Sequence, residues 1–579
     1  MRHFFHALIC TALLFSNRIS MSQIPITERY KYNQTPTYAE VIDFFRQADS
    51  ASPFMQIQQG GITDAGIPLH VLVIDADAEF DAAKARSRGK NILFINNGIH
   101  PGEPDGIDAC IQWIQELSRS ADLRTLLGNM VVCIIPVYNI DGALNRNSTS
   151  RVNQDGPESF GFRGNARNYD LNRDFMKADS RNAIAFTRLF RKWDPDVFID
   201  THVSNGADYP YVMTLIPTQH NKLTPPLGSY LKDTMLPALY FGMDQSGFPM
   251  CPYVNEINRI PDNGIMGFLD RPRYSTGYTA LYNTIGFMPE THMLKPYPRR
   301  VESTLAFIKV VHAYVQKNGT AIFTERSKAK NATRELKSLV LDWELDTMRT
   351  EHFLFNGYAA KYKISAVSGL ERLYYDRNEP FSKEIIFMDQ FTPSLTIDAP
   401  AAYAVPQAWD KVIENLEANG VQMETLQEDT TMQVQAYYIT GMQTTLQPYE
   451  GHYYHSEVSV RSEPQSITLF KGDRIIYLNQ DANQYLMYAL EPQSPDGFFA
   501  WGLFDAILMQ KEWFSDYVFE DLAAEILIED PALRAQLEAK KSADTEFAAD
   551  ASAQLQFVYE HSPYKERSHM RYPIYRIER

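Results

Sequence analysis

The sequence predicts an α/β fold in which helices cover a mostly parallel mixed sheet, followed by a second, β-rich mixed domain. Short apolar runs, such as residues 92–95 and 130–137, are typical of strands buried on both faces of a parallel sheet. Helical patterns alternate with these runs in the first half of the chain, as in βαβ units. After Arg349, shorter strand patterns separated by turns replace this alternation. The change predicts two domains of different architecture.

Length and charge limit the possible organisation and partners. A chain of 579 residues is too long for one core, and we predict a signal peptide at 1–22, an α/β domain at 23–345 and a β-rich accessory domain at 346–579. The 71 acidic and 55 basic residues give a net charge of −16, which argues against a nucleic-acid partner. After the N-terminal segment, no stretch reaches the ~18 uninterrupted apolar residues that a membrane span needs.

The N-terminal segment has the pattern of a secretory signal peptide. Arg2 precedes an apolar stretch at 4–15, and small polar residues follow it. We expect cleavage near residues 20–22 and a secreted or periplasmic protein. An ordinary N-terminal helix is the alternative, because the small-residue cleavage pattern is poor and Arg18 lies close to it.

The elements of the first domain follow from the spacing of apolar residues. Helices are predicted where these recur every three or four positions, as Ile107, Ile111 and Ile114 do after Pro104. Strands are predicted at short continuous apolar runs. In order, the predicted elements are a helix at 37–48, strands at 70–74 and 92–95, a helix from 104, a strand at 130–137, a helix at 182–193, strands at 196–200, 210–215 and 284–290, and a helix at 300–317.

The second half is predicted from the same signals. A charged stretch at 321–345, without Gly or Pro, is expected to be a helix that bridges the two domains. The accessory domain is expected to contain strands at 362–367, 384–388, 433–438 and 475–478 and a helical stretch at 498–527.

The predicted strand at 92–95 ends in a turn that carries His100 and Glu103. Open α/β sheets hold their ligands at the carboxyl ends of the strands, and His202 likewise follows the predicted strand at 196–200. Alone, His100 and Glu103 fit a structural pair. Two imidazoles and one carboxylate, however, form a zinc ligand set that leaves the fourth position open, as in catalytic sites. These three residues are therefore candidate metal ligands.

Further motifs resemble those of the zinc metallocarboxypeptidases, the carboxypeptidase A-like family. The motifs are HPGE at 100–103, FRGNARNYDLNRDF at 162–175, His202 and GFMPETH at 286–292, and their order agrees with that family. The resemblance spans about residues 38–315. It implies a carboxypeptidase-like catalytic domain, and we expect a bacterial, secreted member with a C-terminal accessory domain.

The resemblance implies a role for each matching residue around one Zn²⁺ ion per chain. His100, Glu103 and His202 correspond to the metal ligands, the set that binds zinc in carboxypeptidase A. Glu290 corresponds to the general base that accepts a proton from the attacking water. Arg163 corresponds to the residue that stabilises the developing oxyanion. The implied reaction is zinc-dependent hydrolysis of peptide bonds that releases C-terminal amino acids.

Other matching residues correspond to substrate contacts. Asn172 and Arg173 correspond to a clamp on the free terminal carboxylate of a peptide substrate, for which Arg offers a planar, bidentate fork. Asp170 matches a carboxylate that orients a ligand histidine, His100 in our interpretation. The family also places a mobile tyrosine near the end of the substrate. The candidates are Tyr274, Tyr278 and Tyr282. Spacing does not choose decisively among them, and Tyr278 and Tyr274 lead.

Simpler interpretations compete with two of these roles. Arg163 could form only a loop salt bridge, with Arg146, Arg151 or Arg167 supplying the oxyanion charge instead. Asp170 could serve only as an Asx-turn former.

A second cluster of possible metal ligands lies in the accessory domain and consists of Glu450, His452, His455 and Glu457. Histidines three residues apart on a strand point to opposite faces. The cluster also resembles no metal-binding motif, so we do not predict a metal site there.

Two alternative functions stay open from the sequence. The same zinc chemistry would serve an amidase that acts on bacterial cell-wall peptides or small N-acyl amino acids. An inactive relative would only bind peptides or glycans through the β-rich domain, which the complete ligand set and Glu290 disfavour. Neither the side-chain specificity nor the oligomeric state is predicted.

Overall fold

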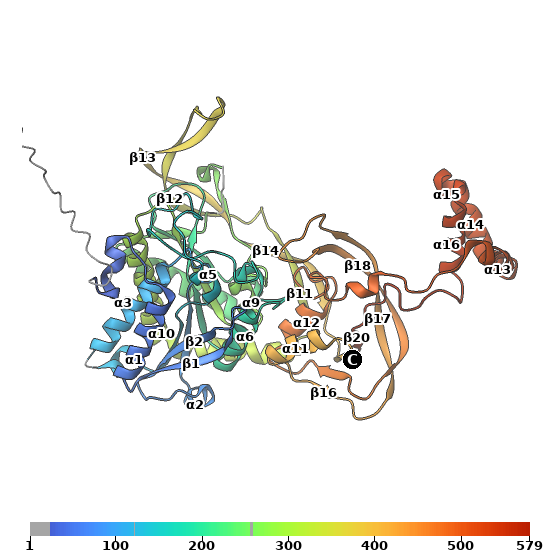
Figure 1. Ribbon diagram of the computed structural model, residues 1–579, viewed down its shortest axis with the longest axis horizontal. Coiled ribbons are helices and arrows are strands. Elements are labelled where there is room, and N and C mark those ends of the chain that lie inside the picture. Colours follow the sequence, from blue (N-terminus) through green and yellow to red (C-terminus); the bar gives the residue numbers. More distant parts are fainter. Residues whose placement is uncertain (1–23, 121, 255–258) are drawn as a thin grey trace, which may run out of the picture.

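The structure, a computed structural model, describes residues 24–120, 122–254 and 259–579. Figure 1 shows an α/β part built on a mixed sheet and a β-rich part that follows it in the chain. A long hairpin of β12 (Glu351–Ile364) and β13 (Glu371–Met388) extends from the α/β part, and helices α13–α16 project at the opposite end of the molecule (Figure 1). The predicted signal peptide lies outside the described residues.

The α/β part is built on a mixed sheet with the strand order β1-β2-β4-β3-β5-β10-β7-β8, and the short β6 also pairs with β10. Strands β4, β3, β5 and β10 run parallel to one another. The pairs β1–β2, β2–β4 and β10–β7 are antiparallel. The predicted helix-covered mixed sheet is thus confirmed. Its strands are β1 (Met55–Ile62), β2 (Pro68–Ile74), β3 (Asn91–Asn96), β4 (Met130–Ile135), β5 (Val197–Asp200), β6 (His202–Ser204), β7 (Met213–Pro217), β8 (Met250–Pro252) and β10 (Ile285–His292).

Helices cover both faces of this sheet. On one face, α1 (Tyr38–Ala51), α3 (Asp105–Arg119) and α10 (Tyr297–Arg334) pack their apolar sides against the strands. On the other face, aromatic side chains of α6 (Arg181–Trp193) pack against β3 and β5. The shorter helices are α2 (Ala82–Ser87), α4 (Leu123–Leu127), α5 (Ile140–Leu144), α7 (Leu227–Tyr230), α8 (Leu236–Gln245) and α9 (Ser275–Ala280).

The β-rich part contains a second sheet with the order β16-β19-β15-β20-β17-β18, the pair β11–β14, and the sheet β12-β13-β9. The predicted β-rich character of this half is confirmed. Two strands of these sheets, β9 (Ile265–Met266) and β11 (Ser338–Leu345), come before residue 346 in the chain. The strands after it, besides β12 and β13, are β14 (Phe391–Asp398), β15 (Ala402–Val405), β16 (Glu424–Thr425), β17 (Thr430–Thr444), β18 (His455–Leu469), β19 (Arg474–Tyr477) and β20 (Tyr575–Ile577). The helices of this half are α11 (Asp410–Ala418), α12 (Asn483–Leu490), α13 (Asp516–Glu529), α14 (Pro531–Ala543), α15 (Thr545–Ala549) and α16 (Ala551–Glu560).

Two helical predictions are wrong in part. The stretch at 321–345 is helical only to Arg334, where α10 ends, and β11 then pairs antiparallel with β14. The stretch at 498–527 forms an α-helix only from Asp516, because its first residues fold into an irregular segment that buries four aromatic side chains. A continuous apolar run does not separate a helix from another buried segment, and tertiary packing decided both cases.

The predicted domain boundary at residue 345 remains a prediction. It falls at the end of β11, whose partner β14 lies beyond it. Strand β13, also beyond it, pairs with β9 through Phe387 and Ile265. The two halves therefore share strand pairing. Among the described residues, no helix has the length and apolar character needed to cross a membrane.

Asp108, on α3, carries a carboxylate buried between helices. Its Oδ2 accepts hydrogen bonds at 2.6 Å from Thr35 Oγ1 and from Tyr297 Oη. Burial raises the pKa of Asp108 to about 7, with the two hydroxyl donors opposing the shift. The folded state therefore holds a proton that the unfolded state releases above pH ~4, so stability falls as pH rises from about 4 to 7.

Replacement of Asp108 by Asn is expected to remove this pH dependence. The wild type should lose melting temperature relative to the variant as pH rises. The difference in melting temperature, wild type minus variant, should be roughly 2–4 °C smaller at pH 8 than at pH 5. Thermal melts at both pH values measure it. Asp43→Asn is the matched control, because Asp43 is exposed and its one ion pair with a described residue is to the exposed Arg46 at 3.6 Å. The same difference at both pH values would contradict the prediction.

Candidate metal centre

Three strand ends converge at the predicted site. β3 and β5 are parallel neighbours that pair Asn96 with Asp200 at their carboxyl ends. The turn with His100 and Glu103 follows β3, and His202 follows β5. β10 lies next to them, with Glu290 in register with His202. The topology of the sheet therefore brings residues almost 200 positions apart to one place.

His100, Glu103 and His202 form one buried cluster. One nitrogen or oxygen atom from each lies within 4.8 Å of the others, and in the described part of the chain this is the one group of three or more such side chains with that geometry. His100 Nδ1 and His202 Nδ1 each lie 3.3 Å from a different oxygen of Glu103. The carboxylate thus sits between the two imidazoles, with both Nδ1 atoms turned toward it.

The outward-facing nitrogens of both histidines are held by carboxylates. His100 Nε2 lies 2.9 Å from Asp170 Oδ1, and His202 Nε2 lies 3.1 Å from Asp200 Oδ2. Such partners fix the tautomer and the orientation of a metal-binding imidazole. The structure brings Asp170 next to His100, and the orienting role of Asp170 stays a prediction. Asp200 was missed, although a strand with Asp and His two positions apart puts both side chains on one face.

This donor set fits Zn²⁺. His100 Nδ1 is buried and has no hydrogen-bond partner among the described residues. In both histidines the other ring nitrogen, Nε2, lies next to a carboxylate, which leaves Nδ1 available as a ligand. A cation placed between the two Nδ1 atoms and Glu103 would be bound by all three side chains. Three protein ligands with an open fourth position are typical of a catalytic rather than a structural zinc site.

Glu290 lies beside the cluster with only 8% of its surface exposed. Burial raises the pKa of Glu290 to about 8, while the charge of His202 opposes this shift and that of Glu103 supports it. A buried carboxyl whose pKa lies near neutrality is suited to exchange protons with a reacting group.

Two arginines reach the cluster. Arg151 Nη1 lies 2.8 Å from Glu103 Oε1, and its Nε and Nη2 donate to Gln154 and Val203. Arg163 Nη1 lies 3.5 Å from the same Glu103 oxygen, and its side chain is 44% exposed. Arg163 also pairs with Asp170 Oδ2, through Nε at 2.9 Å and Nη2 at 2.8 Å. All three nitrogens of each arginine therefore face protein acceptors, and Arg163 differs from Arg151 in the greater exposure of its side chain. The two remaining alternatives, Arg146 and Arg167, donate to backbone carbonyls of other segments.

Asn172 and Arg173 lie in a 3-10 turn, Leu171–Arg173, that follows Asp170. Arg173 donates from Nη1 to the Asn172 carbonyl at 2.9 Å and from Nε to Tyr449 Oη at 3.1 Å. Among the described residues, its Nη2 has no hydrogen-bond partner. Arg173 therefore keeps a donor edge for an anionic ligand.

The two predicted tyrosines differ in position. Tyr274 lies beneath Arg173, with the guanidinium carbon 4.5 Å from the centre of its ring. Tyr278 is fully buried in the core, and its hydroxyl donates to Asn419 Oδ1 at 2.6 Å. This position does not fit a substrate contact, because the ring packs among Phe175, Phe190 and other core side chains.

The residues of the second cluster do not converge. His452 pairs with Asp179 at 2.5 Å, and His455 pairs with Asp505 at 2.9 Å. Glu450 accepts a hydrogen bond from the backbone of Asp170. Glu457 accepts a hydrogen bond from Gln443 Nε2 at 2.6 Å, so the four side chains have separate partners.

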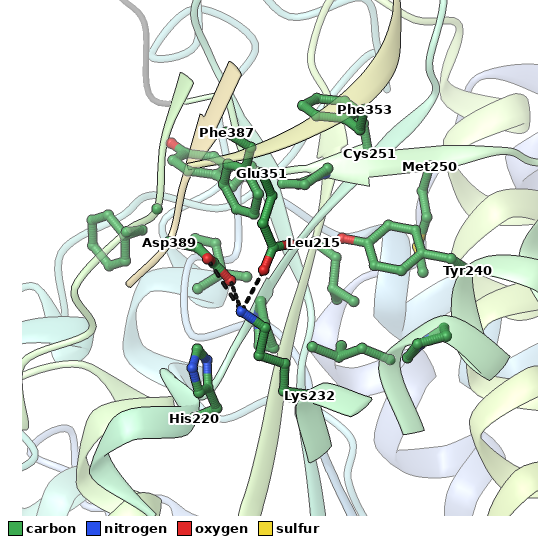
Figure 2. A pocket seen from close by; sticks show the side chains of 18 of the residues that line it. Leu215, His220, Lys232, Tyr240, Met250, Cys251, Glu351, Phe353, Phe387 and Asp389 are labelled. Atoms are coloured by element: carbon green, nitrogen blue, oxygen red, sulfur yellow. Dashed lines mark hydrogen bonds and ion pairs between the residues drawn. The ribbon is translucent and has the colours of Figure 1, made fainter. Parts of the chain in front are cut away.

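An apolar cavity of about 310 Å³ lies at the edge of the α/β sheet (Figure 2). Lys232 reaches into it and pairs with Glu351 at 2.6 Å and Asp389 at 3.4 Å. The metal ligands and Glu290 do not line this cavity. Tyr253 lines it, and burial first, then the charges of Glu290 and Glu103, raise its pKa. No signal in the sequence marked Tyr253.

The decisive comparison concerns the segment that carries the metal ligands. Residues 41–209 match the model of the zinc carboxypeptidase family. The resemblance to the zinc metallocarboxypeptidases is confirmed. With it, the predictions of a metallocarboxypeptidase that hydrolyses peptide bonds and of a zinc cofactor are confirmed.

Individual relatives are distant. Carboxypeptidase 2 of Trichophyton rubrum is 21% identical over 490 residues, which cover 81% of this chain and 84% of that protein. Probable carboxypeptidase 2 of Arthroderma benhamiae is 21% identical over 424 residues, covering 70% and 74%. A crystal structure of a metallo-carboxypeptidase from Burkholderia cenocepacia superposes on 49% of this chain and 70% of its own, with 16% identity and a TM-score of 0.37.

The family match contains the three predicted zinc ligands, Arg163 and the pair Asn172 and Arg173, but it ends before Glu290. The roles of the individual residues of this metallocarboxypeptidase site therefore stay predictions. The expected bacterial source also stays a prediction, and the two curated relatives above are fungal.

Proposed function

We propose that this protein removes C-terminal residues from peptides that carry a free terminal carboxylate. The observation that carries the proposal is that one short segment contacts the metal site and also carries the free donor edge of Arg173. Asp170 holds His100 through Oδ1, and Arg173 follows it by three residues. A substrate anchored by its carboxylate at Arg173 would present its last peptide bond to the metal centre.

Each side chain has a defined task in hydrolysis. When bound, Zn²⁺ lowers the pKa of a water ligand toward ~7 and polarises the scissile carbonyl. The Glu290 carboxylate accepts the proton of the attacking water and passes it to the leaving amine. The Arg163 guanidinium donates hydrogen bonds to the oxyanion as charge develops. Asp170 and Asp200 keep both imidazoles oriented with Nδ1 toward the metal.

Replacement of Arg173 by Ala is expected to impair hydrolysis of free peptides far more than of their C-terminal amides. The guanidinium binds a carboxylate more strongly than a neutral amide, so kcat/KM for the free peptide should fall by roughly 10²-fold, as for a lost charged hydrogen bond. Steady-state kinetics on a matched pair of peptides measure the ratio.

A matched control is Arg167→Ala, because Arg167 lies on the same loop but is exposed and donates to the Asp179 carbonyl. It should leave the ratio unchanged. Equal loss on the free and amidated peptides would remove Arg173 from the clamp. Mass spectrometry of products from a mixed library of peptides and cell-wall fragments would separate the carboxypeptidase from the amidase. We also propose a secreted or periplasmic location, which the N-terminal sequence pattern supports.

A further inference from the structure

One turn of the β-rich part contacts the segment that carries the clamp. The turn comprises Tyr449, Glu450, Gly451 and His452, and we call it the Tyr449 turn. Glu450 Oε2 accepts a hydrogen bond from Asp170 N at 2.9 Å across a separation of 280 residues. Tyr449 Oη accepts the hydrogen bond from Arg173 Nε. Residues of the second half of the chain thus complete the surroundings of the predicted substrate site.

The backbone of the Tyr449 turn is unusual for its sequence. Tyr449 and His452 exchange backbone hydrogen bonds of 2.8 and 3.1 Å. The two residues between them, Glu450 and Gly451, have φ angles of 49° and 84°. Two-residue hairpin turns with positive φ at both positions favour Asn-Gly, not Glu-Gly. A non-glycine residue held in this region points to a functional constraint, and the Glu450 side chain is directed at Asp170.

Packing holds the turn between the two halves of the chain. The Tyr449 ring stacks on the fully buried Trp501, with centroids 6.0 Å apart and planes 17° apart. Arg273 lies 5.1 Å from the Trp501 ring and donates to the buried Asp496 at 2.8 Å. His452 closes the other side through Asp179. Since each of these groups has a partner, the Tyr449 hydroxyl is held at one position.

The position of that hydroxyl determines the orientation of Arg173. Four groups surround the guanidinium: Tyr449 at Nε, the Asn172 carbonyl at Nη1, the Asp170 carboxylate 3.8 Å from Nη1, and the Tyr274 ring beneath it. Together they leave the Nη2 edge free. If the bond at Nε is removed, the contacts at Nη1 and with the Tyr274 ring remain, but none of them holds Nε, so the flexible side chain of Arg173 can turn this edge away.

We propose that the Tyr449 turn is part of the substrate-binding site and that Tyr449 and Glu450 are positioning residues that set the preference for a free C-terminal carboxylate. This inference rests on the proposed function. Tyr449 acts on Arg173 directly. Glu450 acts on the backbone of Asp170, whose carboxylate also holds His100. The β-rich part is thereby an obligate component of the active site rather than an independent appendage.

Replacement of Tyr449 by Phe tests the inference in the full-length, zinc-loaded protein. Phe keeps the ring on Trp501 and removes only the hydroxyl. We expect KM for a free peptide to rise roughly tenfold with kcat within about twofold, and KM for the amidated peptide to stay unchanged. The control is Tyr453→Phe, since Tyr453 is adjacent in sequence but 54% exposed. It should change neither constant.

Two Glu450 variants give an independent test. Glu450→Gln keeps an oxygen that can accept from Asp170 N, whereas Glu450→Ala removes it. We expect Gln to preserve, and Ala to raise, KM for the free peptide. If the role is merely structural, both variants lower the melting temperature without changing the ratio of KM values between free and amidated peptides. That result would overturn the inference for Glu450.

Equilibrium binding separates this inference from the proposed function. The probe is a pseudopeptide whose last amide is reduced to CH₂–NH, as a free acid and as an amide, titrated calorimetrically into wild type and Tyr449→Phe. A tenfold loss for the free acid alone supports the inference, even if wild type releases no C-terminal residues and the proposed function fails. Equal affinity of wild type and variant for the free acid overturns the inference while leaving the proposed function intact.

Discussion

Replacement of Glu290 by Gln is expected to reduce kcat at least ~10²-fold while the zinc content stays that of the wild type. Gln has nearly the same size but cannot accept the proton of the attacking water. Glu290 is buried beside Glu103, and a buried carboxyl next to a second carboxylate costs stability unless it serves a purpose. Steady-state kinetics on a free peptide and metal analysis of the purified variant measure the two quantities.

A surface glutamate provides the control for this variant. Glu302→Gln on α10 removes a carboxylate whose one ion pair within the described ranges is to the exposed Arg299 at 2.8 Å, and it should leave kcat unchanged. A Glu290→Gln protein that keeps more than a tenth of the wild-type kcat with full zinc content would refute the role of general base. Loss of zinc together with activity would instead show that Glu290 supports the metal.

The metal centre could be predicted from the sequence because its parts lie at the ends of recognisable strands. The apolar runs before His100, His202 and Glu290 predict buried parallel strands, and such strands end at one edge of the sheet. The strands are observed at those positions as β3, β5 and β10. The placement of Asp170 next to His100 follows the motif rather than any periodicity, and the observed distance of 2.9 Å agrees with it.

Contacts between the two halves could not be predicted. Glu450 and Asp170 are 280 residues apart, and neither periodicity nor a motif relates them. The sequence marked Glu450 only as a member of an acidic and histidine-rich cluster. Its left-handed backbone is visible only in the folded chain. The prediction that Tyr278 contacts substrate fails for a related reason. Spacing alone does not distinguish a tyrosine in a cleft from a buried one, such as Tyr278, whose hydroxyl donates to Asn419 in the core.

The geometry of the zinc ligands also determines how the protein should respond to metal loss. With Asp170 and Asp200 bound to the outer nitrogens, both imidazoles keep Nδ1 toward Glu103. The folded protein therefore presents a preformed site, which the unfolded chain lacks. Binding to the folded state alone raises the free energy of unfolding by RT ln(1 + [Zn²⁺]/Kd), about 2.7 kcal/mol at a hundredfold excess over Kd.

Removal of zinc by chelation is expected to abolish the release of C-terminal amino acids, to below roughly 1% of the starting rate, because the metal supplies several kcal/mol of transition-state stabilisation. It should also lower the melting temperature, and one equivalent of Zn²⁺ should restore both. Activity assays and thermal melts with metal analysis of each sample measure this. Treatment with chelator already saturated with zinc is the control. Unchanged hydrolysis after verified metal loss would contradict the mechanism, because Glu290 and Arg163 alone cannot activate water to that extent.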